Sequence, residues 1–232
     1  MTQLGSVPYL NARPLLWGLE ARLAPPSQLA QWLRAGEVDA ALVPIVEVIE
    51  NPVYWLVDGV AIGCDGPVHS VILTLEKPLA EVRTVALDAA SKTSVRLMQW
   101  LLERHYGLFP VYVPDGASAD AQLRIGDPAI AYRQADPEHA LVDLGEAWRE
   151  ATGLPFVFAV WAMRAPDIAL AERLRAAARD GLSHRDEIGR EAWQRQYLTE
   201  HIRYELGERQ REAMARFAGD LRGAPGPPFV WV

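Results

Sequence analysis

Residues 27–43, SQLAQWLRAGEVDAALV, carry the pattern of an α-helix that leads into a buried β-strand. The apolar positions of the first part recur at the spacing of one helical face: Leu29, Trp32 and Leu33. Residues 27–35 are therefore expected to form a helix with Ser27 as its N-cap. The mostly apolar run 38–43 is expected to be a strand buried on both faces. With an apolar strand at residues 4–9, this strand–helix–strand order predicts a parallel α/β sheet.

The same alternation continues to about residue 163, after which the pattern becomes helical. Further strands are expected at residues 54–62, 68–75, 84–87, 111–113, 122–125, 129–132, 141–144 and 156–163. Further helices are expected at residues 14–23, 92–106, 167–182, 184–205 (capped by Ser183) and 208–221. The apolar C-terminal residues 229–232 are expected to dock on the body of the protein. We predict two α/β lobes with a ligand cleft between them: lobe 1 is formed by residues 1–80 and 160–232, and lobe 2 by residues 81–159.

Length and composition exclude several classes of function. With 232 residues, half of them hydrophobic, the chain can bury a core without disulfides or metals. The 23 Lys and Arg residues against 30 Asp and Glu residues give a net charge of -7, so neither nucleic acid nor an anionic membrane is an expected partner. The N-terminal residues resemble no secretory signal and no apolar run is long enough to span a membrane, so we expect a cytoplasmic protein.

The motifs of several common chemistries are missing from the sequence. The five histidines show no metal-ligand spacing, so no metal site is expected. No glycine-rich dinucleotide fingerprint and no Walker A loop is present, so no cofactor is expected. A serine nucleophile elbow is absent, and the lone Cys64 in a turn-like segment is an incidental residue rather than a nucleophile.

The segment 88–94, DAASKTS, follows a predicted strand and opens the predicted helix 92–106. Free backbone N–H groups and the helix dipole favour an anion at such a position. The side chains Ser91, Lys92, Thr93 and Ser94 add three hydroxyl groups and one positive charge. An ordinary helix cap, in which Ser91 accepts a hydrogen bond from the N–H of Ser94, is the alternative. Because a cap needs only one hydroxyl, we favour a site for a carboxylate.

Other candidate binding residues stand where further predicted strands end. Asn11 lies in a strand-to-helix turn, where open α/β sheets bind ligands, although turns and caps also favour asparagine. Ser70 is either a ligand-facing hydroxyl or a satisfied core hydroxyl, and Asp127 is either a cleft carboxylate or an Asx-turn residue. The remaining candidates are Tyr9, Val43 and Pro44. Together these residues describe a cleft of hydroxyl groups, amides and helix N-termini that suits a small carboxylate.

Seven segments resemble, in order, the chorismate dehydratase family of the futalosine route to menaquinone. They are VPYLNARPL (7–15), GEVDAALVP (36–44), VHSV (68–71), LDAASKTS (87–94), LRIGDPA (123–129), DLGEAW (143–148) and TGLPFVFA (152–159). The resemblance covers most of residues 4–163. Two positions depart from the family pattern: Lys92 stands where arginine is more frequent, and Val48 stands where an aromatic residue often follows the glutamate.

The resemblance implies the fold of type II periplasmic binding proteins, used in the cytoplasm. It implies a carbon–oxygen lyase that removes water from chorismate to give 3-[(1-carboxyvinyl)oxy]benzoate. We expect Asn11 to be the catalytic residue, without metal or cofactor. The expected substrate-binding residues are Tyr9, Val43, Pro44, Ser70, Ser91, Lys92, Thr93, Ser94 and Asp127. Two alternatives remain: the related 1,4-dihydroxy-6-naphthoate synthase, against which the YLN and SKTS matches argue, and a non-catalytic carboxylate-binding protein.

Overall fold

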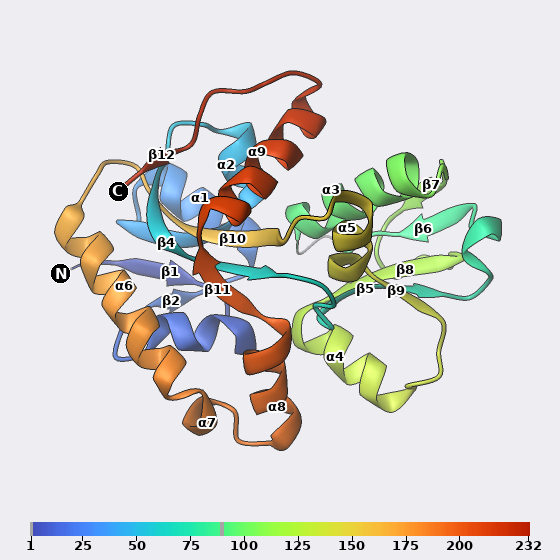
Figure 1. The fold of residues 1–232 in the computed structure, drawn as a ribbon, viewed down its shortest axis with the longest axis horizontal. Coiled ribbons are helices and arrows are strands. Elements are labelled where there is room, and N and C mark those ends of the chain that lie inside the picture. The colour runs from blue at the N-terminus through green and yellow to red at the C-terminus, as the bar shows by residue number, and fades with distance from the viewer. Residues whose placement is uncertain (1, 89–90) are drawn as a thin grey trace.

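The computed structural model describes residues 2–88 and 91–232 and shows two β-sheets flanked by helices (Figure 1). The first sheet has the strand order β11-β4-β10-β3-β1-β2, with β12 paired to β4. The second sheet has the order β7-β6-β8-β5-β9. The predicted α/β class is confirmed.

The described strands mix parallel and antiparallel neighbours. In the first sheet, β1 is parallel to both β2 and β3, whereas β10 is antiparallel to β3 and β4. The strands of this sheet are β1 (Leu4–Ser6), β2 (Arg22–Leu23), β3 (Ala40–Pro44), β4 (Trp55–Cys64), β10 (Phe156–Met163), β11 (Arg203–Leu206) and β12 (Val230–Trp231). Those of the second sheet are β5 (Val71–Leu75), β6 (Thr84–Ala86), β7 (Val111–Val113), β8 (Ala121–Ile125) and β9 (Leu141–Asp143).

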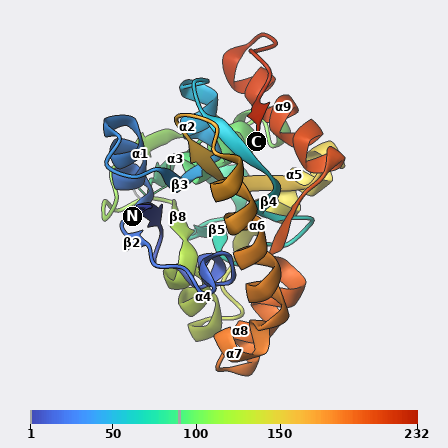
Figure 2. The ribbon, with the colours of Figure 1, turned by 90° about the vertical axis from the view of Figure 1, so that its left-hand side faces the viewer.

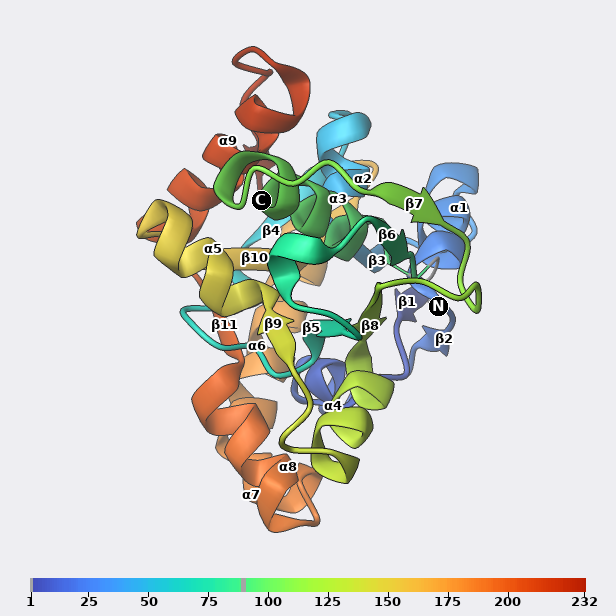
Figure 3. The ribbon, with the colours of Figure 1, turned by 90° about the vertical axis from the view of Figure 1, so that its right-hand side faces the viewer.

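Helices pack on both sheets, and Figures 2 and 3 show the molecule from the side of each lobe. The helix α6 packs along β4 and along the 3-10 helix Leu10–Leu16, while α1 packs on β3 and α9 on β10. The described α-helices are α1 (Pro26–Ala35), α2 (Ile45–Glu50), α3 (Lys92–Trp100), α4 (Gly126–Ala135), α5 (Leu144–Thr152), α6 (Ile168–Ser183), α7 (Arg185–Ile188), α8 (Ala192–Gln196) and α9 (Glu208–Arg222). Two π-helical segments, Leu101–His105 and Tyr197–His201, extend α3 and α8.

Several predicted elements are corrected by the structure. Residues 129–132 lie inside α4 and form no strand, and residues 14–23 hold the end of a 3-10 helix and the short strand β2 instead of a helix. The predicted helix 184–205 is divided into α7, α8, a π-helical segment and β11. Neither predicted serine cap forms: Pro25 precedes α1, and the Ser183 hydroxyl donates to the Asp180 carbonyl.

The chain crosses between the sheets twice. It leaves the first sheet after β4 and returns from α5 to β10. The strand β5 therefore belongs to the second sheet, although the predicted lobe division at residue 80 places it in lobe 1, and β10 joins the first sheet from residue 156. The division into two domains stays a prediction. Boundaries placed at the two crossings, between β4 and β5 and between α5 and β10, agree with the sheets better than boundaries at residues 80 and 160.

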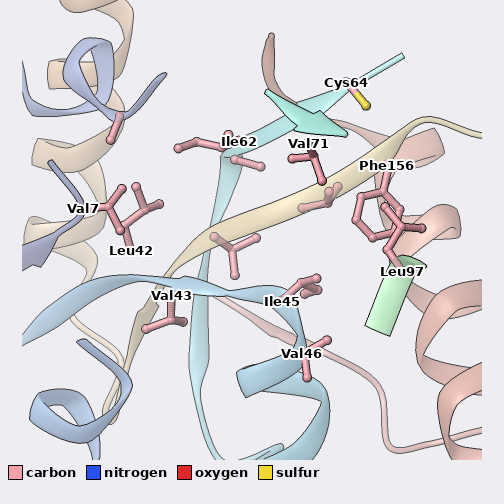
Figure 4. Packing of buried hydrophobic residues seen from close by; sticks show 14 of the residues in the cluster. Val7, Leu42, Val43, Ile45, Val46, Ile62, Cys64, Val71, Leu97 and Phe156 are labelled. Atoms are coloured by element: carbon pink, nitrogen blue, oxygen red, sulfur yellow. The ribbon is translucent and has the colours of Figure 1, made fainter. Parts of the chain in front are cut away.

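One aromatic cluster joins α3 and α5 of the second lobe to β10 and α9 of the first sheet. The ring of Trp148 on α5 lies 5.6 Å from Phe217 on α9 and 5.2 Å from Phe156 on β10, and Trp100 on α3 lies 4.8 Å from Trp148. Buried residues of both sheets form a single hydrophobic core, part of which Figure 4 shows. As predicted, the C-terminal apolar residues dock, because β12 pairs with β4. None of the helices within the described ranges is both long and apolar enough to cross a membrane.

Candidate functional site

A cavity that is open at its mouth lies between the two sheets. Both lobes and one crossing line it, so that a bound molecule would touch segments far apart in the sequence. Most of its wall is apolar, with a few polar side chains at defined places, as is typical of small-molecule sites. The described residues that line it are Val7, Tyr9, Asn11, Pro26, Leu42, Pro44, Ile62, Val68, Ser70, Val71, Ser91, Ser94, Ile125, Gly126, Phe158, Ala159 and Ile202.

Six of the predicted site residues meet at this cavity, because strands end or begin next to them. Tyr9 and Asn11 follow β1, and Pro44 ends β3, its parallel neighbour. Ser70 immediately precedes β5, at the end of the crossing between the sheets. Ser91 and Ser94 stand at the start of α3, where the Oγ of Ser91 accepts from the backbone N–H of Ser94 at 3.2 Å. The expected cap therefore forms, and both serines also line the cavity. Ala89 and Ala90 of the same predicted motif lie outside the described residues.

Four other predicted site residues do not line the cavity. Val43 is fully buried in the core of the first sheet, and Thr93 accepts a hydrogen bond from the backbone N–H of Val46 at 3.3 Å. Lys92 pairs instead with Glu50, at 3.5 Å. The Oδ1 of Asp127 accepts from the backbone N–H of Leu10 at 3.3 Å and thus links the two lobes.

A buried hydrogen-bond network stands at the polar end of the cavity. The hydroxyl of Tyr197 donates to the Oγ of Ser70 at 2.7 Å and accepts from the Nδ2 of Asn11 at 3.3 Å. The hydroxyl of Tyr204 donates to the backbone carbonyl of Asn11 at 3.0 Å. The Oδ1 of Asn11 is buried and has no partner among the described residues. Asn11, a residue of the cavity wall, therefore has a buried acceptor that no described residue uses.

Two backbone features shape the apolar wall. The pairing of β10 with β4 shifts register between Val157 and Ala159, and this bulge turns Phe158 and Ala159 to the cavity. Gly126, the first residue of α4, has φ +64°, and a Cβ on it would lie 3.3 Å from the Tyr9 ring. The sequence predicts neither these wall residues nor Tyr197, because a bulge and a contact between residues 186 positions apart leave no local pattern.

The described residues that line the cavity carry no formal charge at neutral pH. Burial, followed by the nearby Asp88 and Asp127, raises the pKa of Tyr9, and burial raises the pKa of Tyr197 well above its ordinary value. Both phenols therefore keep their protons and can donate. Burial likewise raises the pKa of Cys64, so this thiol is no nucleophile. Within the described ranges, no three metal-binding side chains come together.

Several solved structures share the architecture of this chain. A protein from Archaeoglobus fulgidus is 15% identical, with a TM-score of 0.71 over 95% of this chain and 97% of its own. The periplasmic aliphatic sulphonate binding protein of Escherichia coli is 15% identical, with a TM-score of 0.62 over 100% and 92%. A Candida albicans protein of the generic periplasmic binding protein fold is 13% identical, with a TM-score of 0.63 over 95% of this chain and 88% of its own. The fold is therefore that of a periplasmic-binding-protein-like protein, as expected.

The sequence places the chain more narrowly within this class. The family model described as menaquinone biosynthesis matches residues 2–222. A chorismate dehydratase from Thermus thermophilus is 34% identical over 98% of this chain and 97% of its own length. The chain belongs to the menaquinone biosynthesis family.

Proposed function

We propose that the interlobe cavity binds chorismate and that its polar end promotes the loss of water. The protein is a chorismate dehydratase, because it shares 34% identity with such an enzyme over nearly the full length of both chains. This relation carries the assignment, and the expected family resemblance is confirmed by it. The roles of individual residues, and the cytoplasmic location expected from the sequence, stay predictions.

The reaction requires no covalent bond between the protein and the substrate. The C3–H bond and the C4–O bond of chorismate break, a ring double bond forms, and the proton and hydroxide leave as water. The product ring is aromatic, so the driving force lies largely in the substrate. The protein must hold the two carboxylates and align the departing groups. A cavity with neutral donors and a mostly apolar wall suits this task.

We assign the polar groups of the cavity as follows. The start of α3, with the hydroxyl groups of Ser91 and Ser94, holds one carboxylate by the helix dipole and by hydrogen bonds. Ser70 and Pro44 position the ring and the side chain. The amide of Asn11 is too weak a base to take the C3 proton. The enolpyruvyl carboxylate of the substrate takes it, while Asn11 holds the geometry.

A direct assay tests the proposed function. Purified protein is incubated with chorismate, and the aromatic enol ether is followed by ultraviolet absorbance and mass spectrometry. Turnover is the expected result. Binding of chorismate without turnover would contradict the enzyme and support a carboxylate-binding protein instead. The related naphthoate synthase would likewise give no enol ether.

Two substitutions test the residue roles. Asn11→Ala is expected to lower kcat by about 100-fold or more, because it removes the group that aligns the substrate. Asp127→Asn is expected to keep kcat within about threefold, because an amide oxygen can still accept from Leu10. If Asp127 were the base, the second variant would lose activity by orders of magnitude.

A further inference from the structure

Tyr197 lies at the start of a π-helical segment and reaches the cavity network from outside the cavity wall. The segment Tyr197–His201 continues α8, and its first residue is only 3% exposed. π-helical turns are rare and occur frequently at functional sites. The sequence gives no indication of a role for Tyr197, because its two side-chain partners lie 186 and 127 positions away.

The hydrogen bonds of Tyr197 fix the orientation of two groups. Its single hydroxyl proton goes to the Oγ of Ser70 at 2.7 Å, so it can only accept from Asn11. Its partner on Asn11 must then be the Nδ2 group, at 3.3 Å. This leaves the Oδ1 of Asn11, which is buried and has no partner among the described residues, to receive a donor from the substrate. The Ser70 hydroxyl accepts from Tyr197 and so keeps its own proton to donate.

We propose that Tyr197 is a positioning residue for the dehydration, which holds the Asn11 amide with its oxygen toward the substrate and leaves the Ser70 hydroxyl as a donor. This inference rests on the proposed function. It adds which groups of the network donate hydrogen bonds and which accept them. The oxygen of Asn11 then accepts from the C4 hydroxyl group of chorismate and orients it, so that the enolpyruvyl carboxyl group, which has taken the C3 proton, passes it to the C4 oxygen as the C–O bond breaks and water leaves. Without Tyr197 the amide can rotate and present its NH₂ group instead. Burial keeps the Tyr197 phenol protonated at every working pH, because it raises the pKa well above the ordinary value.

The test compares Tyr197→Phe with the matched control Tyr54→Phe. Each variant removes one buried tyrosine hydroxyl, but that of Tyr54 donates to Glu47 and that of Tyr197 bonds Ser70 and Asn11 at the cavity. We expect Tyr197→Phe to lower kcat by about 10- to 100-fold with KM changed by less than about threefold. Tyr54→Phe is expected to keep kcat within about threefold. Equal losses in the two variants, or an unchanged kcat in Tyr197→Phe, would overturn the proposal.

A double-mutant cycle separates positioning from a general loss of packing. If Tyr197 acts through Asn11, the Tyr197→Phe change should cost less than about threefold in an Asn11→Ala background. Multiplicative losses would mean that Tyr197 acts independently, which contradicts the proposal. If the wild-type protein does not turn over chorismate, the proposed function fails, and that result differs from a wild-type enzyme insensitive to Tyr197→Phe.

A measurement on the wild-type protein avoids any question of folding in the variants. The side-chain amide of Asn11 is identified in the ¹⁵N spectrum by its absence in Asn11→Ala. One of its two protons should exchange with solvent slowly, because it is donated to the buried Tyr197 oxygen. Exchange of both protons at the rate of a free amide would contradict the orientation.

Discussion

The close approach of Tyr9 to Gly126 shows how a single residue closes the cavity between the lobes. The ring of Tyr9 comes from the first lobe, and Gly126 opens α4 of the second. The glycine has φ +64°, which other residues adopt only at a cost. A Cβ there would lie 3.3 Å from two atoms of the ring. Two features therefore favour glycine at position 126: the positive φ of its backbone and the short distance to the Tyr9 ring in the cavity wall.

The substitution Gly126→Ala separates these constraints when compared with Gly107→Ala. Gly107 has φ +67° and nothing within 4 Å of a Cβ, so both variants should lose about 1 kcal/mol of stability. Only Gly126→Ala pushes Tyr9 into the cavity, and we expect it to raise KM for chorismate by about tenfold. Urea unfolding and steady-state kinetics measure the two effects. Equal KM values in the two variants would show that the contact with Tyr9 is unimportant.

The site residues that follow the first strand could be predicted from the sequence. Tyr9 and Asn11 come directly after an apolar run, and the ends of parallel strands meet at one edge of a sheet. Thr93 has the same local pattern as Ser91 and Ser94, but the helical rotation turns it to the other lobe. Tyr197 could not be predicted, because only the folded chain brings it to Asn11.

The helix α2 has its first turn capped by a side chain of the opposite lobe. Pro44, its N-cap residue, can offer no capping side chain. The Oγ1 of Thr93, which is buried on α3, accepts from the backbone N–H of Val46 at 3.3 Å. Helix starts leave several N–H groups without helical partners, and a buried one is costly. Thr93 therefore joins two helices as well as two lobes.

Replacing Thr93 by valine should destabilise the protein without changing its core volume. The Val46 N–H then loses its acceptor, and we expect a loss of about 1–2 kcal/mol in the free energy of unfolding. Thr93→Ser keeps the hydroxyl and is expected to lose less than half as much, although it removes a buried methyl group. Chemical unfolding at pH 7 measures both. If the serine variant were the less stable of the two, packing rather than the hydrogen bond would explain the role of Thr93.

Helices and strands with a long hydrophobic periodicity can be predicted from the sequence. Elements whose structure depends on proline or on tertiary contacts cannot. The helix beginning at Lys92 is clear from its apolar stripe. The sequence GDPA at 126–129 is typical of a turn, yet it starts α4, since proline is tolerated in a first helical turn. The single helix predicted for residues 184–205 is wrong, because α7 ends before Gly189 and residues 203–206 form β11 in the first sheet.

Across the molecule, one crossing between the sheets is fixed by a carboxylate and a pair of stacked histidines. Asp143 accepts from the backbone N–H groups of Val68 and His69, at 2.9 and 2.7 Å. The rings of His69 and His201 stack with centroids 3.6 Å apart. His69 has φ +63°, which is uncommon for a residue other than glycine. These contacts hold Ser70, the next residue, at the cavity.

The histidine pair predicts that the protein becomes less stable as the pH falls. Burial, the neighbouring His201 and then Arg133 lower the pKa of His69 to about 4, from an ordinary 6.5. Burial also lowers the pKa of His201, against the attraction of Glu200 and Asp143. The unfolded chain therefore binds more protons below pH 6.5, and the stability that is present above that pH is lost as the pH falls toward 4.

We expect His69→Asn to remove part of this loss, since asparagine tolerates a positive φ and does not titrate. Between pH 7 and pH 4.5 the wild-type protein should lose about 1 kcal/mol more than the variant, a figure reduced for the partial exposure of His69. Urea unfolding at several pH values measures the difference. Parallel profiles would show that His69 does not govern this window.

A structure determined with 3-[(1-carboxyvinyl)oxy]benzoate tests the location of the reaction most directly. We predict that the aromatic ring lies in the cavity between Tyr9 and Phe158, with one carboxylate at Ser91 and Ser94 and the former C4 position beside Asn11. Product bound elsewhere on the protein, with this cavity empty, would contradict the account.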